Sequence, residues 1–336
     1  MNQDLSVIVL AAGKGTRMKS EKAKVLHEVF YAPMLQHVLN SVNSLAPQET
    51  VVVVGHQSDK VKDQLTAYNV TFAEQTEQLG TGHAVLAAEN ELAGLSGTVM
   101  ILCGDTPLIR PSMLTDLLQH HVDHLAQVTL LTTKLDNPAN YGRIISDDDG
   151  NILAIVEHKD ANPEELLIQE INAGIYCVDK DFLFASLKNV GTNNSQGEVY
   201  LTDIVKLAVE EGLKVKTFVT PDSIDVLGVN SRLELSQAQT ELQLRRNKEL
   251  MTLGISMINP ETIRISSDST ILADCVIEPC VHIHGASNIG HTTVIEQCAV
   301  LKNCSVGDGA IIGAHSYLTN TTVSNGQIIP PHTTIL

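Results

Sequence analysis

The chain has 336 residues, of which 43% are hydrophobic and 18% charged, and its formal net charge is −17 at pH 7. This length allows two domains with cores of their own, and the composition is that of a globular rather than a disordered protein. So acidic a chain disfavours a partner such as nucleic acid or an anionic membrane, although a small phosphorylated ligand needs only a few local cations and backbone N–H groups. No run of about 18 apolar residues and no basic leader occurs, so we expect a cytoplasmic protein.

Short β-branched runs alternate with helical spacing in the first part of the chain. Strands are expected at 6–10, 50–54 and 98–102, and helices at 34–42 and 59–65. Apolar strands separated by helices predict a mainly parallel sheet covered on both faces, so this part is an α/β, Rossmann-like domain. Ligands bind at the carboxyl ends of the strands in such sheets, and Gly13 and Gly104 mark two of these ends.

A long helix and a repetitive tail follow. Residues 231–253 are expected to form one amphipathic helix that Gly254 ends as a C-cap. A hexapeptide period in the tail predicts a short left-handed parallel β-helix, with about four coils at 18 residues per coil. Its large apolar anchors are Ile265, Ile271, Ile277, Ile283, Ile289, Ile295, Leu301, Val306, Ile312, Leu318, Val323, Ile329 and Ile335.

A second, smaller residue is expected to be buried four positions after each anchor. These positions hold Ser269, Cys275, Val281, Ser287, Thr293, Ala299, Ser305, Ala310, Ser316, Thr322 and Thr333, while Gln327 breaks the pattern. The expected division of the chain is an α/β domain at 1–230, a linker helix at 231–254 and the β-helix at 255–336. Cys280 and Cys298 fall one coil apart and are expected to be reduced, and the tail histidines are expected at corners or on the surface.

The glycine-rich segment LAAGKGTRM at 10–18 is the first candidate for chemistry. Gly13 and Gly15 allow backbone N–H groups to approach phosphate oxygens, and Arg17 and Lys24 add two cations nearby. The spacing matches neither the Rossmann fingerprint nor the P-loop, so a simple strand-to-loop turn is the competing interpretation.

This segment, followed by KVLH at 24–27, resembles the start of the bacterial N-acetylglucosamine-1-phosphate uridyltransferases, the pyrophosphorylase half of a bifunctional family. The resemblance continues in order along the chain through EQLGTGHA at 77–84, GDTPL at 104–108, YGRI at 141–144, EHKD at 157–160, EIN at 170–172, QGE at 196–198, TDI at 202–204 and GVN at 228–230. Motifs in this order over nearly the whole chain are far more specific than any one of them alone.

The resemblance implies roles for individual residues. Arg17 and Lys24 would hold the phosphates as catalytic residues, Asp105 and Asn230 would bind Mg²⁺, and Gly142, Glu157 and Asn172 would contact the N-acetylglucosamine group. The uridine nucleotide would be lined by Leu10, Ala11, Ala12, Gly13, Gly15, Gln75, Gly80, Thr81, Cys103 and Gly104. The implied reaction joins UTP and N-acetylglucosamine-1-phosphate by in-line attack on the α-phosphorus, with Mg²⁺ as cofactor.

Several of these residues have plainer interpretations. Asp105 follows a strand and could be a turn residue, Asn230 could cap the linker helix, and the segment 157–160 could be a solvated loop. The chain also departs from the family at Ala23, Cys103, Ala173, Val199 and Ser231, where the family has Pro, Tyr, Thr, Tyr and Asn. The changes at Cys103 and Ala173 bear on sugar selectivity more than on the reaction type.

Three functions therefore stay open: this uridyltransferase, a sibling enzyme for another sugar-1-phosphate or nucleotide, and an idle β-helix assembly subunit. In the bifunctional relatives the β-helix extends further and builds an acetyltransferase site. Because residues matching that site are missing, we expect no acetyltransferase activity. The family also implies a homotrimer formed through the β-helix.

Overall fold

The computed structural model describes residues 2–138 and 140–336, which fall into two compact units. One unit comprises Met1–Glu28 and Ala32–Arg232, and the other comprises Val29–Tyr31 and Leu233–Leu336. Each has a hydrophobic core of its own, as expected for a chain of this length.

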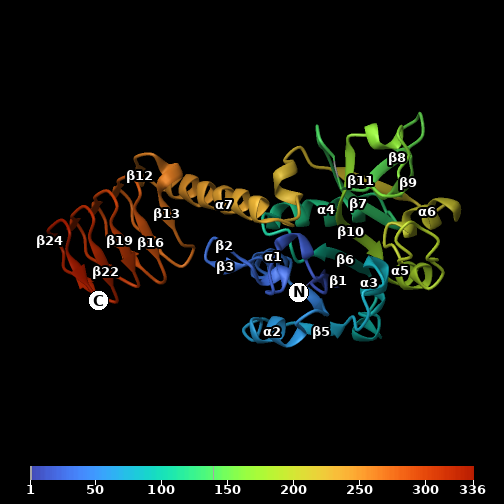
Figure 1. The fold of residues 1–336 in the computed structure, drawn as a ribbon, viewed down its shortest axis with the longest axis horizontal. Helices are drawn as coiled ribbons and strands as arrows, with labels where there is room; N and C mark the ends of the chain where they lie inside the picture. The colour runs from blue at the N-terminus through green and yellow to red at the C-terminus, as the bar shows by residue number, and fades with distance from the viewer. Residues whose placement is uncertain (1, 139) are drawn as a thin grey trace. The chain divides into compact units, whose positions relative to one another are not determined.

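The first unit is built on a nine-stranded sheet with the order β11-β7-β10-β6-β1-β4-β5, and the β8–β9 hairpin is attached to β10 (Figure 1). The pairs β6–β1, β1–β4, β4–β5 and β7–β11 are parallel, whereas β10 is antiparallel to β6 and β7. The strands are β1 (Asn2–Leu10), β4 (Pro47–Val54), β5 (Thr71–Glu74), β6 (Thr98–Cys103), β7 (Val128–Lys134), β8 (Arg143–Ser146), β9 (Ile152–Val156), β10 (Glu170–Asp179) and β11 (Val215–Val219).

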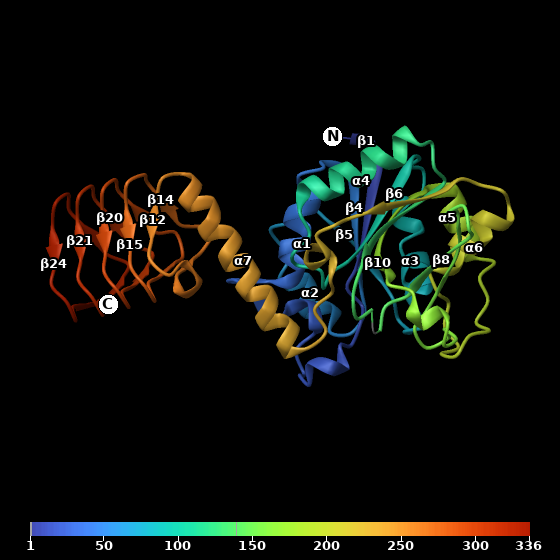
Figure 2. The same ribbon diagram turned by 90° about the horizontal axis from the view of Figure 1, so that it is seen from above.

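Helices cover both faces of this sheet, as the sequence predicts (Figure 2). One core packs α1, α2 and α4 against the sheet, and the other packs α3, α5 and α6. The helices are α1 (Met34–Asn43), α2 (Ser58–Asp63), α3 (Thr81–Leu86), α4 (Pro111–Asp123), α5 (Lys180–Leu187) and α6 (Asp203–Glu210). Short 3₁₀ turns lie at Thr16–Met18, Lys24–Leu26, Asn90–Leu92, Glu165–Leu167 and Ser223–Val226, and a small hairpin joins β2 (Glu28–Val29) to β3 (Ala32–Pro33).

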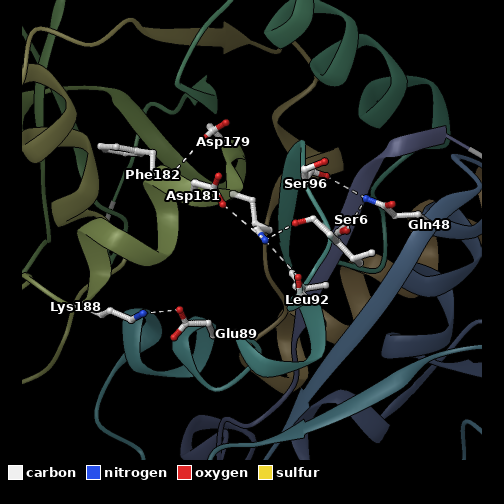
Figure 3. Close-up of polar contacts among 11 residues, drawn as sticks. Ser6, Gln48, Glu89, Leu92, Ser96, Asp179, Asp181, Phe182 and Lys188 are labelled. Atoms are coloured by element: carbon white, nitrogen blue, oxygen red, sulfur yellow. Dashed lines mark hydrogen bonds and ion pairs between the residues drawn. The ribbon is translucent and has the colours of Figure 1, made fainter.

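Polar side chains tie the strands together at the amino ends of β4 and β6 (Figure 3). Gln48 donates to the hydroxyl of Ser6 at 3.3 Å and to the carbonyl of Ser96 at 3.2 Å. Asp179, at the end of β10, caps α5 by accepting the N–H of Phe182 at 2.9 Å. The Gln48 contacts thus join β1, β4 and the segment before β6 at the edge of the sheet opposite the carboxyl ends of these strands.

The second unit contains helix α7 (Arg232–Thr252) and the β-helix. Gly254 follows α7 with a φ of 93°, which is the C-cap role expected of it. The coils stack into three parallel sheets of five, five and four strands (Figure 1). The first sheet contains β12 (Ser256–Met257), β15 (Val276–Ile277), β18 (Val294–Ile295), β21 (Ile311–Ile312) and β24 (Ile328–Ile329). The second contains β13 (Arg264–Ile265), β16 (His282–His284), β19 (Val300–Lys302), β22 (Tyr317–Thr319) and β25 (Thr334–Ile335). The third contains β14 (Thr270–Ile271), β17 (Asn288–Ile289), β20 (Ser305–Val306) and β23 (Thr322–Val323), and Pro260–Thr262 is a 3₁₀ turn.

The expected anchors form the core of this β-helix, since all of them from Ile265 to Ile329 are at most 6% exposed. The expectation was wrong for three of the small residues, because Ser305 and Thr322 are exposed on their strands and Thr333 is only half-buried. The five-residue steps precede Val306 and Val323 and remove one residue from the turn. The buried position therefore moves one residue earlier after Leu301, to Cys304, which is 1% exposed.

No helix within residues 2–138 and 140–336 is long and apolar enough to cross a membrane. The division at 1–230, 231–254 and 255–336 stays a prediction.

Candidate active site

A cleft opens in the first unit where β1 and β6 end. These strands are neighbours, with Leu10 paired to Cys103, and Gly104 continues the contact by donating its N–H to the carbonyl of Leu10 at 2.9 Å. Two adjoining cavities, of about 200 and 280 Å³, share Leu10, Thr81, Cys103 and Asp105 in their walls. The carboxyl ends of two central parallel strands thus form the floor of one cleft, as expected for an α/β sheet.

The larger cavity brings together most of the residues that the resemblance assigns to the nucleotide. Leu10, Ala11, Ala12, Gly13, Gln75, Gly80, Thr81 and Cys103 all line it. Gln75 is buried and donates from Nε2 to the carbonyl of Gly80 at 3.0 Å, which holds the loop before α3 in place. Gly80 has a φ of 110°, and a Cβ there would lie 2.5 Å from the carbonyl oxygen of Val199, so only glycine fits.

Three polar side chains meet at the junction of the two cavities. The Lys24 ammonium forms an ion pair with the Asp105 carboxylate and donates to Oδ1 of Asn230 at 2.7 Å. The Lys24 and Asp105 side chains are each only 15% exposed. The oxygens of Asp105 and Asn230 therefore converge on one cation, although the two residues lie 125 positions apart in the sequence.

The smaller cavity holds the three residues expected to contact the sugar. Gly142 accepts the N–H of Asn172 at 2.9 Å, and its Cα faces both Asn172 and the Glu157 carboxylate. Asn172 donates from Nδ2 to the Tyr176 hydroxyl at 2.6 Å and accepts the N–H of Gly174 at 3.0 Å. The Asn172 amide is thus oriented by two partners before any ligand binds.

Glu157 lines the same cavity and accepts a hydrogen bond from the Thr202 hydroxyl at 3.4 Å. Burial raises the pKa of this carboxyl group above its ordinary value, and the nearby acids Asp160, Asp203 and Glu198 raise it further, against the lowering effect of Thr202. A carboxyl group in this setting is suited to accept hydrogen bonds from sugar hydroxyls.

Cys103 forms part of the wall between the two cavities. Burial raises the pKa of its thiol to about 12, and the neighbouring Asp105 carboxylate contributes to the rise. The thiol is therefore neutral near pH 7, and Cys103 serves as a small side chain lining the cavities rather than as a nucleophile. Ala173 lines the sugar side of the same wall.

Arg17, Gly15 and Gly104 are the expected site residues that line neither cavity. Arg17 is exposed on the Thr16–Met18 turn. Gly15 has a φ of 62°, and a Cβ there would lie 2.5 Å from Cβ of Lys24, so its absence of a side chain makes room for that lysine.

Comparison with known proteins identifies the class of this site. Residues 6–241 match the family model of the nucleotidyl transferases. The chain is 52% identical over 326 residues to "Bifunctional protein GlmU" of Desulfotalea psychrophila, an alignment covering 97% of this chain and 96% of the relative. The protein of the same name from Pelobacter propionicus is 42% identical, with 98% of this chain and 72% of the relative covered. The chain belongs to the GlmU-type nucleotidyl transferases.

The fold of this transferase also matches a crystal structure from Bacillus anthracis assigned as a glucose-1-phosphate thymidylyltransferase. The TM-score is 0.55 at 18% identity, with 70% of this chain and 94% of the other covered. At this identity, the comparison supports the fold alone. The family establishes the transferase as an enzyme of sugar-1-phosphate nucleotidyl transfer.

The sequence did not assign roles to Tyr176, Thr202 or Arg143 of the transferase. Tyr176 and Thr202 line the sugar-side cavity, and the buried Arg143 donates to the carbonyl of Tyr141, which lines it too. Tyr176 lines the cavity together with Asn172, four residues earlier on β10, and the register of β10 against β7 shifts between these two residues, next to Gly174 with its φ of 75°. The motifs YGRI and TDI contain Arg143 and Thr202, but a motif alone does not say which of its side chains faces the cleft.

Proposed function

We propose that this transferase joins UTP and N-acetylglucosamine-1-phosphate to give UDP-N-acetylglucosamine and pyrophosphate. An oxygen of the sugar phosphate attacks the α-phosphorus of UTP, and the bond from that phosphorus to the oxygen bridging to the β-phosphate breaks. The observation that carries the proposal is the meeting of two cavities at Lys24, Asp105 and Asn230. Nucleotide and sugar phosphate would then meet beside a fixed positive charge, in a reaction that depends on positioning and charge neutralisation.

Enzymes of this type generally depend on a divalent metal, and we assign Mg²⁺ to Asp105 and Asn230. The fit rests on their oxygens, which already converge on a cation, the Lys24 ammonium. Mg²⁺ favours oxygen ligands and takes few from the protein, with phosphates and water completing its shell. When bound, it would neutralise charge on the phosphates. Lys24 and Arg17 would hold the phosphate oxygens, with Arg17 approaching from its exposed turn.

The substrate contacts are assigned by cavity. Leu10, Ala11, Ala12 and Gly13 would contact the nucleotide together with Gln75, Gly80, Thr81, Cys103 and Gly104, while Gly15 would shape the loop. Gly142, Glu157 and Asn172 would contact the N-acetylglucosamine group. The two-cavity division of the cleft supports these assignments except those of Gly15 and Gly104, which depend on the resemblance of the motifs alone.

A second candidate is transfer to another sugar-1-phosphate. It is favoured by Cys103 and Ala173, two small side chains in the wall of the sugar-side cavity. The test measures pyrophosphate release over a panel of nucleoside triphosphates and sugar-1-phosphates, with Mg²⁺ and after chelation. The proposal expects the highest kcat/KM for UTP with N-acetylglucosamine-1-phosphate. A clear preference for another pair would contradict the proposal and support the second candidate. No turnover with any pair would support the interpretation of the chain as an idle assembly subunit.

The remaining expectations concern the second unit and the setting of the enzyme. We propose a cytoplasmic homotrimer formed through the β-helix, which light scattering of the purified chain tests. Absence of acetyltransferase activity stays a prediction, tested by incubation with glucosamine-1-phosphate and acetyl-CoA. Acetylated product would contradict it.

A further inference from the structure

One corner of the β-helix carries a column of side chains from successive coils: Thr262, Cys280, Cys298, His315 and His332. The last three each donate a backbone N–H to a carbonyl of the preceding coil, at 3.0, 3.0 and 2.9 Å. The N–H of Cys280 is bound instead by the Thr262 hydroxyl, at 2.9 Å. Cys280, Cys298, His315 and His332 share a φ of 59–60°, so their side chains leave the corner in the same direction.

The two thiols in this column are neighbours and lie at the surface. Cys280 is exposed and Cys298 partly exposed, whereas Cys275 and Cys304 of the same unit are buried. Burial, and then the Cys280 thiol, raise the pKa of Cys298, and the Cys280 effect includes a side-chain hydrogen bond. In the next two coils, the rings of His315 and His332 stack on each other with centroids 5.1 Å apart.

The spacing of coils suits a covalent bond between these thiols. Neighbouring strands of a sheet lie about 4.8 Å apart, and a disulfide joins Cα atoms that are about 4.4–6.8 Å apart. The usual distance between the two Cβ atoms of a disulfide is about 3.8 Å. If the Cα–Cβ bonds of Cys280 and Cys298 are parallel, their Cβ atoms lie about 4.8 Å apart, and they must move about 1 Å closer when the disulfide forms. A strained and exposed disulfide is readily reduced again, as reversible ones are.

We propose that Cys280 and Cys298 form a reversible disulfide between successive coils when a low-molecular-weight disulfide such as oxidised glutathione is present. One protein thiolate attacks a sulfur of glutathione disulfide and displaces the first glutathione thiolate. The second protein thiolate then attacks the protein sulfur of this mixed disulfide and displaces the second. Two protein thiols are oxidised, one glutathione disulfide is reduced to two glutathiones, and these take up the two protons.

Mass spectrometry of the full-length protein after incubation with oxidised glutathione tests the proposal. Free thiols are alkylated first, and the protein is cut with trypsin and Glu-C. Cleavage after Arg264, Glu296 and Lys302 separates Cys298 from Cys280 and Cys275. We expect fragments 265–296 and 297–302 to be joined through Cys280, lighter by two hydrogen atoms than the separate fragments, and released by dithiothreitol. Fragment spectra should show Cys275 alkylated only after unfolding.

Two variants serve as controls. Cys280→Ser should abolish the link and leave glutathione on Cys298. The double variant Thr262→Cys/Cys280→Ser keeps the number of exposed thiols but places the second one two coils from Cys298, and its link should be at least tenfold less abundant. Equal linkage in this variant, independent glutathione adducts on both wild-type thiols, or a bond between two copies on a non-reducing gel would each overturn the proposal. So would retained zinc that protects both thiols from oxidation.

Discussion

Lys24 holds, between Asp105 and Asn230, a position that a hard cation also fits. Two cations cannot share this position, because unit charges a few ångströms apart repel by about 1–4 kcal/mol even in a polar setting. We expect metal binding to displace the ammonium from Asp105 and turn it toward the phosphates. The same three residues would then serve the free and the substrate-bound enzyme with different partners.

Asp105→Ala should lower kcat/KM by about 100-fold or more, because the metal that neutralises charge on the phosphates loses its main protein ligand. Mg²⁺ titration of the activity should also show a higher half-saturating concentration. Asp116→Ala, at an exposed position of α4, is the control and should keep wild-type activity. Full activity in the Asp105 variant would refute the metal assignment.

Glu157 links the site to the pH dependence of stability. Its pKa is raised in the folded state, so its contribution is fully favourable below the unfolded pKa and is lost as pH rises through the folded pKa. Glu157→Gln should therefore gain stability relative to wild type as pH rises above the ordinary carboxyl pKa of 4.5, while its KM for the sugar phosphate rises. Urea denaturation at several pH values measures the first effect. A constant stability difference across this range would contradict the burial argument.

The segments that precede helices α3 and α6 position residues of the active site. The loop before α3 is pinned to the segment before α6, since Gly82 donates to the carbonyl of Val199 and Val199 donates to that of Leu79, both at 2.8 Å. This cross-link fixes Gly80 and Thr81 against the nucleotide-side cavity. The required glycine thus marks a place where two segments meet closely.

Gly80→Ala should destabilise the protein and raise KM for UTP. The backbone at Gly80, with φ 110° and ψ 175°, lies in a region almost restricted to glycine, which costs about 1–3 kcal/mol for alanine, and the contact with Val199 adds to it. Gly94→Ala is the matched control, since Gly94 also has a positive φ, of 80°, but open space around it. Equal losses in urea denaturation would show that the contact with Val199 contributes nothing.

Helix α7 shows what local pattern misses. The sequence predicts an amphipathic helix, yet two of its buried residues are the amides Gln243 and Asn247. Asn247 donates to the carbonyls of Pro260 and Ile263 at 2.7 and 2.9 Å, and Gln243 donates to that of Glu261 at 2.6 Å. These amides donate hydrogen bonds to carbonyl groups of the turn that begins the β-helix. The carbonyl groups take up these positions only when the turn has formed, so the helix pattern alone does not predict that the amides are buried.

The whole chain divides into two units with separate cores, so its unfolding is not expected to be two-state. Ile295→Ala removes a fully buried anchor of the β-helix and should cost about 2–5 kcal/mol there. In calorimetry one transition should move to lower temperature while the other stays. Ile328→Ala, at a 65% exposed position on β24, is the control and should move neither. A single transition shifted as a whole would contradict the independence of the cores.

The sequence by itself determined the α/β class, the β-helix and its buried anchors, and the strand ends at Gly13 and Gly104. These features depend on hydrophobic periodicity and on local backbone conformation, both of which can be recognised in the sequence of neighbouring residues. Tertiary structure decided the exposure of Ser305 and Thr322, the antiparallel insertion of β10 and the entry of Tyr176 into the cleft. It also decided that the oxygens of Asp105 and Asn230 bind the Lys24 ammonium at one position. Such outcomes depend on which distant segments come into contact, and no local pattern encodes the distance between residues that lie more than 80 positions apart.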